Sequence, residues 1–327
     1  MRAVFYTEQG PAASVLEVGE QPTPAPGPGE VRVRLKTSGV NPSDWKVRRG
    51  GFGRGLAFPL IIPHSDGAGD IDAVGAGIPQ SRIDDRVWIW NGQWKRPFGT
   101  AAEYIVVPSE QAVSLADGVG YAEGAGFGIP ALTAVQAVRL AQITSSSTVL
   151  IHGGAGAVGH YAIQFAKIRG ARVLTTISGE SKAKLALEAG ADAVINYRTE
   201  NVGEKVRTLT SGAGVDTVID MDIATNAKLL PAVLGPFGSV VIYGTGAAEP
   251  IIPAQWLMQN SATLRFFLVY ELRPEDRAAA IHELNGALEQ KQITHNIGLR
   301  LPLSDAAAAH EALESGSVTG NVVLDIA

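Results

Sequence analysis

The feature that most constrains the fold is a strand-like run that stops at a cluster of glycines and restarts as a helix. The run 148–151 is β-branched or aliphatic, and the glycines after it have the spacing G-x-G-x-x-G. In this pattern one glycine turns the backbone, one lets a pyrophosphate approach, and one lets the helix pack on the strand. The helix that follows directs free N–H groups and its positive dipole end at the phosphates. The pattern predicts a dinucleotide-binding turn made of Gly154, Ala155, Gly156, Ala157, Val158 and Gly159.

Further strand-like segments after the glycine turn alternate with helical ones. The strand-like segments cover 170–177, 193–195, 216–220 and 238–244, and a helical segment over 182–189 is closed by a glycine. Alternating buried strands and helices predict a doubly wound parallel sheet, the α/β arrangement of a Rossmann domain. The alternative is a structural glycine turn in an α/β domain that binds no dinucleotide.

The end of the second strand indicates which dinucleotide is bound. A site for NADH usually places Asp or Glu about 20 residues past the glycine turn, where it binds the ribose 2′-hydroxyl. This chain has Ser178 there, which does not repel a 2′-phosphate. Lys182 can supply a positive charge, and Tyr197 with Arg198 follows the third strand near the adenosine end. NADPH is therefore favoured over NADH, although Glu180 would favour NADH if a backbone shift brought it to the ribose.

Length, charge and hydropathy exclude several classes of protein. The 327 residues are enough for two compact domains, and a net charge of −5 without a basic block argues against nucleic-acid binding. No apolar run approaches the length of a membrane span, and the chain begins directly as a strand at 3–6, without a signal-peptide core. We therefore expect a cytoplasmic enzyme with neither a nucleic-acid nor a membrane partner.

The absence of cysteine removes disulfides, thiolate catalysis, iron–sulfur clusters and cysteine-containing zinc sites. The six histidines show no metal-ligand spacing such as H-E-x-x-H. His64 comes nearest, in the segment 63–67, and is interpreted as a turn or pocket-wall residue. No metal site is expected.

The first 125 residues differ from the dinucleotide region. Short β-rich segments at 31–35, 69–74 and 86–90 alternate with Pro and Gly turns, which predicts a small antiparallel, barrel-like domain. Helices are expected over 122–141, and over 305–313 before a last strand at 321–324.

These motifs, in this order, resemble the medium-chain dehydrogenase/reductase superfamily, and within it the zinc-independent NADPH:quinone oxidoreductases and related enone reductases. The resemblance covers nearly the whole chain, through the segments 38–46, 66–69 and 130–134, the glycine turn, and 319–324. It implies a Rossmann domain, 126–268, inserted into a discontinuous GroES-like β-barrel domain, 1–125 and 269–327, with the nicotinamide in the cleft between them. It also implies a homodimer, in which the strand-like run 263–270 pairs with its symmetry mate.

The resemblance also bears on the catalytic metal. Zinc alcohol dehydrogenases of this superfamily hold the metal with a Cys, a His and usually a second Cys. Alignment on 66–69 puts Ser65 at the place of the histidine and Asn41 at the place of the first cysteine. Without a Lewis acid, the implied reaction is hydride delivery to an acceptor that is already electrophilic, such as a quinone or an α,β-unsaturated ketone or aldehyde.

Three residues of one short segment are implied to act on the acceptor. Lys46 is expected to donate to the enolate oxygen, with Asn41 as a polar positioning group and Asp44 as an orienting carboxylate. Many quinone oxidoreductases carry a tyrosine where Lys46 stands, whereas a lysine there resembles the enone and alkenal reductases. Quinone and enone reduction thus both stay open, and a plain surface lysine is the alternative reading of Lys46. A non-catalytic NADPH-binding sensor is a further alternative, although it would not need this polar trio.

The remaining cofactor contacts are implied by position. Thr133 lies at the start of the helix leading into the Rossmann half, Gly244 and Thr245 follow the fifth strand, and Phe267 follows the sixth. Asn321 lies near the final strand, where many relatives place a lysine.

Overall fold

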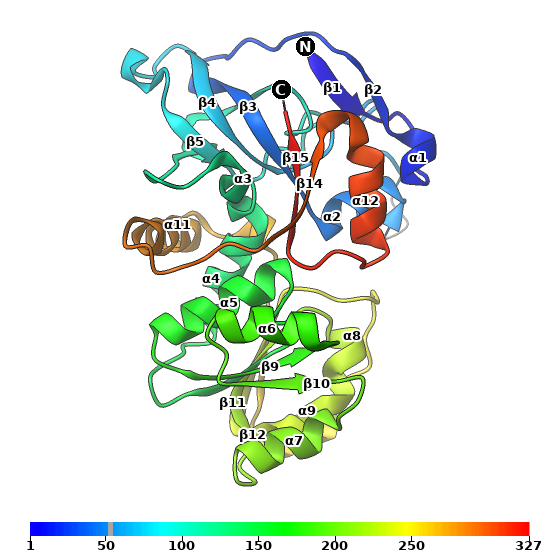
Figure 1. The fold of residues 1–327 in the computed structure, drawn as a ribbon, viewed down its shortest axis with the longest axis vertical. Helices are drawn as coiled ribbons and strands as arrows, with labels where there is room; N and C mark the ends of the chain where they lie inside the picture. The colour runs from blue at the N-terminus through cyan, green and yellow to red at the C-terminus, as the bar shows by residue number, and fades with distance from the viewer. Residues whose placement is uncertain (52–54, 327) are drawn as a thin grey trace. The chain divides into compact units, whose positions relative to one another are not determined.

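The computed structural model of the chain describes residues 1–51 and 55–326 and divides into two compact units, coloured along the chain in Figure 1. Unit 1 comprises Met1–Pro130 and His295–Ala327, and unit 2 comprises Ala131–Thr294. These bounds differ from the domain limits expected from the sequence, mainly because residues 269–294 belong to unit 2. There, helix α11 (Pro274–Glu289) contacts helix α4 (Leu132–Leu140).

Unit 2 is built on six parallel strands in the order β10-β9-β8-β11-β12-β13. From β8 the chain winds outward through β9 and β10, then returns to the other side of β8 and winds outward again from β11. This is the predicted doubly wound sheet, and its switch point lies between β8 and β11. The strands are β8 (Thr148–Ile151), β9 (Arg172–Ile177), β10 (Ala193–Asn196), β11 (Val215–Asp220), β12 (Leu234–Ile242) and β13 (Thr263–Phe266).

Helices cover both faces of this sheet. Figure 1 shows α5 and α6 on one side and α7 and α9 on the other. On the second side Leu150, Val218 and Val240 of the sheet pack with Val206 of α7 and Leu230 of α9. The further helices of unit 2 are α5 (Ala157–Ile168), α6 (Glu180–Glu188), α7 (Val202–Leu209), α8 (Ile223–Asn226), α9 (Leu230–Val233) and α10 (Ala254–Gln259), with 3-10 turns at Ala227–Leu229 and Val269–Glu271.

Helix α11 was not among the helices predicted from the sequence, although its first residues are typical of a helix start. Pro274 occupies its first turn, followed by two acidic residues, Glu275 and Asp276, which favour a helix N-terminus. The predicted strand 263–270 is shorter in the structure, because a 3-10 turn follows soon after Phe266.

Unit 1 is dominated by a seven-stranded sheet in the order β14-β15-β3-β4-β5-β7, with β6 also paired to β3. Its pairings are antiparallel, as expected, except that β14 and β15 run parallel. Along β3 the buried side chains alternate, at Val31, Val33 and Leu35, because successive side chains of a strand point to opposite faces. The strands are β3 (Glu30–Val40), β4 (Asp66–Val74), β5 (Arg86–Ile89), β6 (Tyr104–Pro108), β7 (Ala112–Ser114), β14 (Ile297–Pro302) and β15 (Asn321–Asp325), and β1 (Arg2–Phe5) pairs separately with β2 (Glu17–Glu20).

The helices of unit 1 are short, and α12 contacts both α1 and α2. The predicted helical stretch 122–141 is divided into α3, a π-helix at Phe127–Ala131 and α4. Pro130 lies inside the π-helix, where it has no N–H to continue a regular α-helix. The helices are α1 (Ala12–Val15), α2 (Pro42–Arg48), α3 (Tyr121–Gly124) and α12 (Ala306–Glu314), with 3-10 turns at Gln80–Arg82, Ser109–Gln111 and Leu303–Asp305.

Among the residues that the structure describes, no helix combines the length and the apolar character that crossing a membrane requires.

Candidate functional site

The predicted dinucleotide turn joins β8 to α5 at the carboxyl edge of the parallel sheet. Helix α5 starts at Ala157, with Gly156 as its N-cap. The first N–H groups of a helix have no intrahelical acceptor, so they are available to a phosphate at this end. Gly156, Ala157 and Val158 are partly exposed, whereas Gly154, Ala155 and Gly159 are buried. The first three are thus placed to meet a ligand, and the others support packing.

The left-handed residue of the turn is Gly153, with φ 71°, one position before the predicted triplet. Its N–H donates to Thr176 Oγ1 at 3.1 Å, and the Gly154 N–H donates to the Thr176 backbone oxygen at 3.2 Å. Thr176 lies on β9, the strand beside β8. The neighbouring strand therefore holds the turn, which the glycine spacing alone does not predict.

Gly159 has room only for hydrogen. A Cβ at this position would lie 2.2 Å from the Gly153 carbonyl oxygen and 2.9 Å from Gly154 Cα. The first turn of α5 packs directly on the backbone that leaves β8, as the third glycine of the fingerprint implies.

Two buried polar residues at the switch point were not predicted from the sequence. His152 follows β8 and Asp220 ends β11, and the pairing of Ile151 with Ile219 sets them on adjacent strands. His152 Nδ1 is hydrogen-bonded to Thr176 Oγ1 at 3.2 Å. Burial lowers the pKa of His152, and the charge of Asp220 opposes this, so the imidazole is neutral at pH 7. The available signal was a polar residue at the end of each of two apolar strands.

Ser178, Lys182 and Tyr197 gather around the ends of β9 and β10. The Tyr197 N–H donates to the Ile177 carbonyl oxygen at 3.1 Å, which places Tyr197 beside the end of β9. Lys182 lies in the first turn of α6, whose first residue is the exposed Glu180. The structure thus brings together the residues expected at the ribose, including the glutamate that would favour NADH.

Gly244, Thr245 and Phe267 follow β12 and β13 at the same carboxyl edge. The Phe267 N–H donates to the Ile242 carbonyl oxygen at 3.1 Å, so the two loops start side by side. The Thr245 hydroxyl donates to the Ala247 carbonyl oxygen at 2.7 Å and is engaged within its own loop.

Thr133 and Asn321 belong to different units. Thr133 is buried in the first turn of α4 in unit 2. Asn321 begins β15 in unit 1, where its backbone N–H and its Nδ2 both donate to the Asn296 carbonyl oxygen, at 2.8 and 3.0 Å. The amide nitrogen of Asn321 is therefore already engaged within unit 1.

Helix α2 of unit 1 carries the residues expected to act on the acceptor. Asn41 is its N-cap, and Asp44 Oδ2 accepts the Asn41 N–H at 2.7 Å, as the acidic residue of a capping box does. Spacings of three and four put Asn41, Asp44 and Arg48 on one face of the helix, and all three are buried. Lys46 lies about 200° around the helix from Asp44 and is partly exposed.

Asn41 joins two buried carboxyl groups. Its side-chain Nδ2 donates to Asp66 Oδ2 at 2.9 Å, and Asp66 Oδ2 also accepts the Ile129 N–H at 3.1 Å. Burial raises the pKa of Asp44 to about 7, and burial raises the pKa of Asp66 well above its ordinary value, against the bond from Asn41. Because one N–H of its side-chain amide is donated to Asp66, Asn41 is fixed in orientation, and only the second N–H of this amide is left for an acceptor.

Lys46 is a cation without a counter-charge in the part of the chain that the structure describes. Its Nζ lies 5.9 Å from the ring centroid of Trp45, near the outer limit of a cation–π contact. No hydrogen bond or ion pair joins this ammonium group to residues 1–51 or 55–326. Lys46 is therefore available to a ligand.

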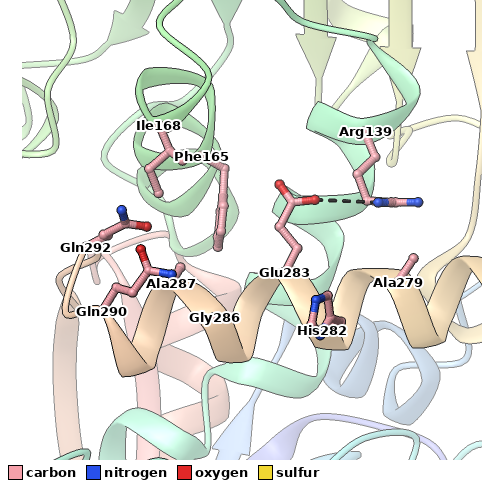
Figure 2. A pocket seen from close by; sticks show the side chains of 10 residues that line it. All are labelled: Arg139, Phe165, Ile168, Ala279, His282, Glu283, Gly286, Ala287, Gln290 and Gln292. Atoms are coloured by element: carbon pink, nitrogen blue, oxygen red, sulfur yellow. Dashed lines mark ion pairs between the residues drawn. The ribbon is translucent and has the colours of Figure 1, made fainter.

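A hollow of about 400 Å³ on unit 2 lies elsewhere, between α4, α5 and α11 (Figure 2). Phe165 and Ile168, in its wall, are eight or more residues beyond Ala157, the first residue of α5, which is roughly 12 Å or more along the helix. Its Arg139 is paired with Glu283 at 3.5 Å, as Figure 2 shows, and Arg169 also contacts Glu283 at 2.9 Å. The hollow is therefore separate from the glycine turn and its charges are compensated.

Comparisons with known proteins cover both units. A family described as "Alcohol dehydrogenase GroES-like domain" matches residues 27–117, and one described as "Zinc-binding dehydrogenase" matches 157–286. Proteins named quinone oxidoreductase from Rattus norvegicus and Pseudomonas aeruginosa are 30% and 32% identical to the chain. Each match covers 99% of this chain, with 97% and 98% of the relative.

Solved structures are similar over the full length. A mycobacterial protein in complex with NADPH has a TM-score of 0.88 at 32% identity, covering 99% of this chain and 100% of that one. A protein described as an NAD-dependent alcohol dehydrogenase has a TM-score of 0.90 at 29% identity, with 100% of both chains covered. Within residues 1–51 and 55–326, no group of three or more His, Asp or Glu side chains is gathered to hold a metal.

Replacing Gly159 with alanine tests the close approach at the turn. The added Cβ collides with the Gly153 carbonyl, so we expect a lower melting temperature and a loss of NADPH affinity of about tenfold or more, measured by fluorescence titration. Gly286→Ala is the matched control, because a Cβ there meets no atom within 4 Å and alanine favours a helix interior. Equal NADPH affinity in both variants would contradict the role of Gly159.

The buried carboxyl of Asp44 makes stability depend on pH. Its folded pKa of about 7 lies above the ordinary value of 3.8, so the folded state favours the protonated form. This contribution is complete below pH 3.8 and is lost as the pH rises toward 7 and above. We expect the free energy of unfolding of Asp44→Asn, relative to the unaltered protein, to increase between pH 4 and pH 8 in urea titrations. Parallel pH profiles for the two proteins would show that Asp44 is not held in its protonated form.

Proposed function

Because the chain belongs to the medium-chain dehydrogenase/reductase superfamily, with full-length relatives named quinone oxidoreductases, we propose that it transfers hydride from NADPH to a quinone without zinc. The coarser activity, an NADPH-dependent oxidoreductase, rests on these relatives and on the similar structure that contains NADPH. The choice of a quinone as acceptor follows the names of these relatives, whereas the chemistry proposed at its oxygen rests on residues of this chain.

The glycine turn fits a dinucleotide. Gly159 lets the first turn of α5 pack on the backbone that leaves β8, and Gly156, Ala157 and Val158 present partly exposed backbone at the start of α5. This surface would hold the pyrophosphate, as helix N-termini commonly do. When bound, NADPH supplies a hydride from C4 of its nicotinamide.

The preference for NADPH is assigned to the surroundings of Ser178. A 2′-phosphate there would meet Lys182 on α6 and Tyr197 beyond β10, and Arg198 adds a second exposed cation nearby. Glu180 is the opposing group, but its backbone N–H also belongs to the first turn of α6, which favours an anion. The net local charge of this set, two cations and one carboxylate, supports the phosphorylated cofactor.

The observation that carries the proposed chemistry at the acceptor is the ammonium group of Lys46, which has no counter-charge within the described residues. When a hydride reaches a conjugated carbonyl, negative charge develops on its oxygen. Lys46 can stabilise that charge by a charge-assisted hydrogen bond, since it has no counter-charge within the described residues. Asn41 and Asp44 act indirectly in this proposal, by fixing the start of α2.

Reduction of the C=C bond of enones or alkenals is the second candidate. The same lysine favours it, because an enolate needs a donor at oxygen while the hydride is added at carbon. A saturated ketone lacks the conjugation that makes either acceptor electrophilic, so we expect it to be a poor substrate.

The residues at the former metal positions suit a zinc-independent reaction. The Ser65 hydroxyl accepts the Gln93 N–H at 3.3 Å, and the Asn41 amide is bonded to Asp66. Hydroxyl and amide groups are not among the side chains that bind zinc in most catalytic sites. This chain, which matches a family described as zinc-binding dehydrogenase, is therefore proposed to keep the fold with other side chains at the metal positions.

We also infer a homodimer in the cytoplasm. Strand β13 is the last strand of the parallel sheet, and Phe266 at its end is 59% exposed, which leaves an edge suited to pairing with a second copy. The mass in solution, by light scattering, decides between one chain and two.

Lys46→Ala should lower kcat by about tenfold or more while leaving the Kd for NADPH nearly unchanged, because the lost donor acts on the transition state. Lys36→Ala, which removes another partly exposed lysine of unit 1, is the control. The assay follows NADPH oxidation, with a chelator present, against a benzoquinone, a naphthoquinone, an alkyl vinyl ketone, a 2-alkenal and a saturated ketone. Unchanged turnover of Lys46→Ala would mean that Lys46 is a surface lysine without a role in the reaction. A preference for the vinyl ketone or alkenal over the quinones would favour enone reduction. Bound NADPH without turnover of any acceptor would favour a cofactor sensor.

Lys182→Ala should narrow the preference for NADPH over NADH, because only NADPH carries the 2′-phosphate. Lys184→Ala is the control on the same helix, where the lysine is 78% exposed and lies 3.8 Å from Glu188. Both cofactors are titrated by fluorescence. Equal losses of affinity for NADPH and NADH in Lys182→Ala would refute the assignment.

A further inference from the structure

Five fully buried side chains of unit 1 form one hydrogen-bonded chain between α2 and β4. Arg48 Nε lies 3.4 Å from His310 Nδ1, His310 Nε2 lies 2.8 Å from His64 Nε2, and His64 Nδ1 lies 2.8 Å from Ser38 Oγ. Ser38 Oγ lies 2.8 Å from Thr100 Oγ1, which bonds the Asp66 carbonyl oxygen at 2.5 Å. Each of the five side chains is 0% exposed. They come from α2, α12, β3 and two loops.

The donor in every bond of this chain follows from its end at Asp66. A carbonyl oxygen only accepts, so the Thr100 hydroxyl donates to it, and Ser38 must then donate to Thr100. Ser38 therefore accepts from His64, which carries its proton on Nδ1. Burial lowers the pKa of His64 well below its ordinary value, so this ring is neutral and its Nε2 is bare.

The other end of the chain requires the same order. Arg48 can only donate, so His310 Nδ1 accepts from it and the proton of His310 lies on Nε2. The His310 Nε2–H group therefore donates to the unprotonated Nε2 of His64. Burial and the charge of Arg48 lower the pKa of His310 to about 3, so this ring is neutral as well. All five bonds thus have one donor and one acceptor in a single arrangement.

The chain is unsuited to moving protons, because it ends on a backbone carbonyl that cannot take one. Its geometry serves a different purpose. Asp66, at its end, also binds Asn41, the N-cap of α2, whereas Arg48 begins the chain at the last residue of α2. The bonds therefore close a ring that starts and finishes on the same helix, here called the α2 ring: Arg48, His310, His64, Ser38, Thr100, Asp66 and Asn41.

We propose that the α2 ring fixes the orientation of α2 and, through it, of Lys46, with His64, His310, Ser38 and Thr100 as positioning residues. Hydrogen bonds are directional, so a helix whose buried face is held by them cannot slide or rotate as it could on an apolar surface. Arg48 adds an anchor to α12, because its Nη2 lies 2.9 Å from Glu314 Oε2. The consequence for the reaction rests on the proposed function of Lys46, whereas the ring and its tautomers do not.

The tautomers are measured first, on the unaltered protein with ¹⁵N-labelled histidine. We expect His64 to give the signature of a neutral ring protonated at Nδ1, and His310 that of a neutral ring protonated at Nε2. The ¹⁵N spectra are assigned with single His variants. The opposite tautomer at His64, or a charged ring at either position at pH 7, would overturn the proposal.

The ring is then cut at Thr100 by replacement with valine, which has nearly the same shape but no hydroxyl. Thr217→Val is the matched control: Thr217 is a buried threonine of unit 2, bonded to Ser239 Oγ at 3.0 Å and outside the ring. Thr100→Ser keeps the hydroxyl and should restore the function. We expect about a tenfold lower kcat in Thr100→Val, with an unchanged Kd for NADPH, because small misplacements of a catalytic group have effects of at least this size. Thr217→Val and Thr100→Ser should retain kcat.

Hydrogen exchange of the α2 amides gives a second readout that needs no acceptor. It should be faster in Thr100→Val and unchanged in Thr217→Val. Faster exchange in a protein that reduces no acceptor would support the ring and reject the proposed function of Lys46. Unchanged exchange in Thr100→Val would overturn the ring. Equal, measurable kcat in the two valine variants would overturn the role of the ring in positioning Lys46. If Thr100→Val does not fold, Ser38→Ala removes the neighbouring hydroxyl, cuts the same ring and is read in the same way.

Discussion

The close approach of Gly159 to the carbonyl of Gly153 is the constraint on which unit 2 depends. A Cβ on Gly159 would lie 2.2 Å from that oxygen, which is too close. Because glycine has no Cβ, the first turn of α5 packs directly on the backbone leaving β8. This contact sets where the helix starts and therefore where its unpaired N–H groups lie. Thr176 completes the arrangement from the neighbouring strand by accepting the Gly153 N–H. Shape and hydrogen bonding thus fix the position of the N–H groups that the proposed function assigns to the pyrophosphate.

In unit 1, helix α2 is held in place by polar rather than apolar contacts. The buried face of α2 consists of Asn41, Asp44 and Arg48, and burying such groups is costly unless each finds a partner. Burial raises the pKa of Asp44, because a protonated carboxyl loses less hydration free energy on burial than a charged one. Arg48 stays charged and is met by Glu314 and by a backbone carbonyl. The result is a helix whose orientation is specified by bonds with defined directions.

The glycine turn of unit 2 and helix α2 of unit 1 suit the two reactants of the proposed reaction, NADPH and the acceptor. A dinucleotide carries phosphates, which are well matched by backbone N–H groups and a few cations around Ser178. An electrophilic acceptor needs a donor at its oxygen, and in the proposed function Lys46 supplies it, while Asn41 and Asp44 hold the start of α2. Ser65 and Asn41, which the proposal places at the metal positions of the superfamily, both bond to protein groups.

The sequence by itself determined the doubly wound sheet, its glycine turn and the largely antiparallel character of unit 1. It could do so because these features depend on local patterns: apolar strands, glycine spacing and turn residues. It also located Ser178, Lys182 and Tyr197 as neighbours, since the ends of adjacent parallel strands meet at one edge. Only the tertiary structure decided that α11 joins unit 2, that Asn41 is bonded to Asp66, and that His64 and His310 belong to one ring. Those contacts join residues as far apart as Arg48 and His310. No local pattern encodes them, because they arise only when distant segments pack and their buried polar groups must find partners.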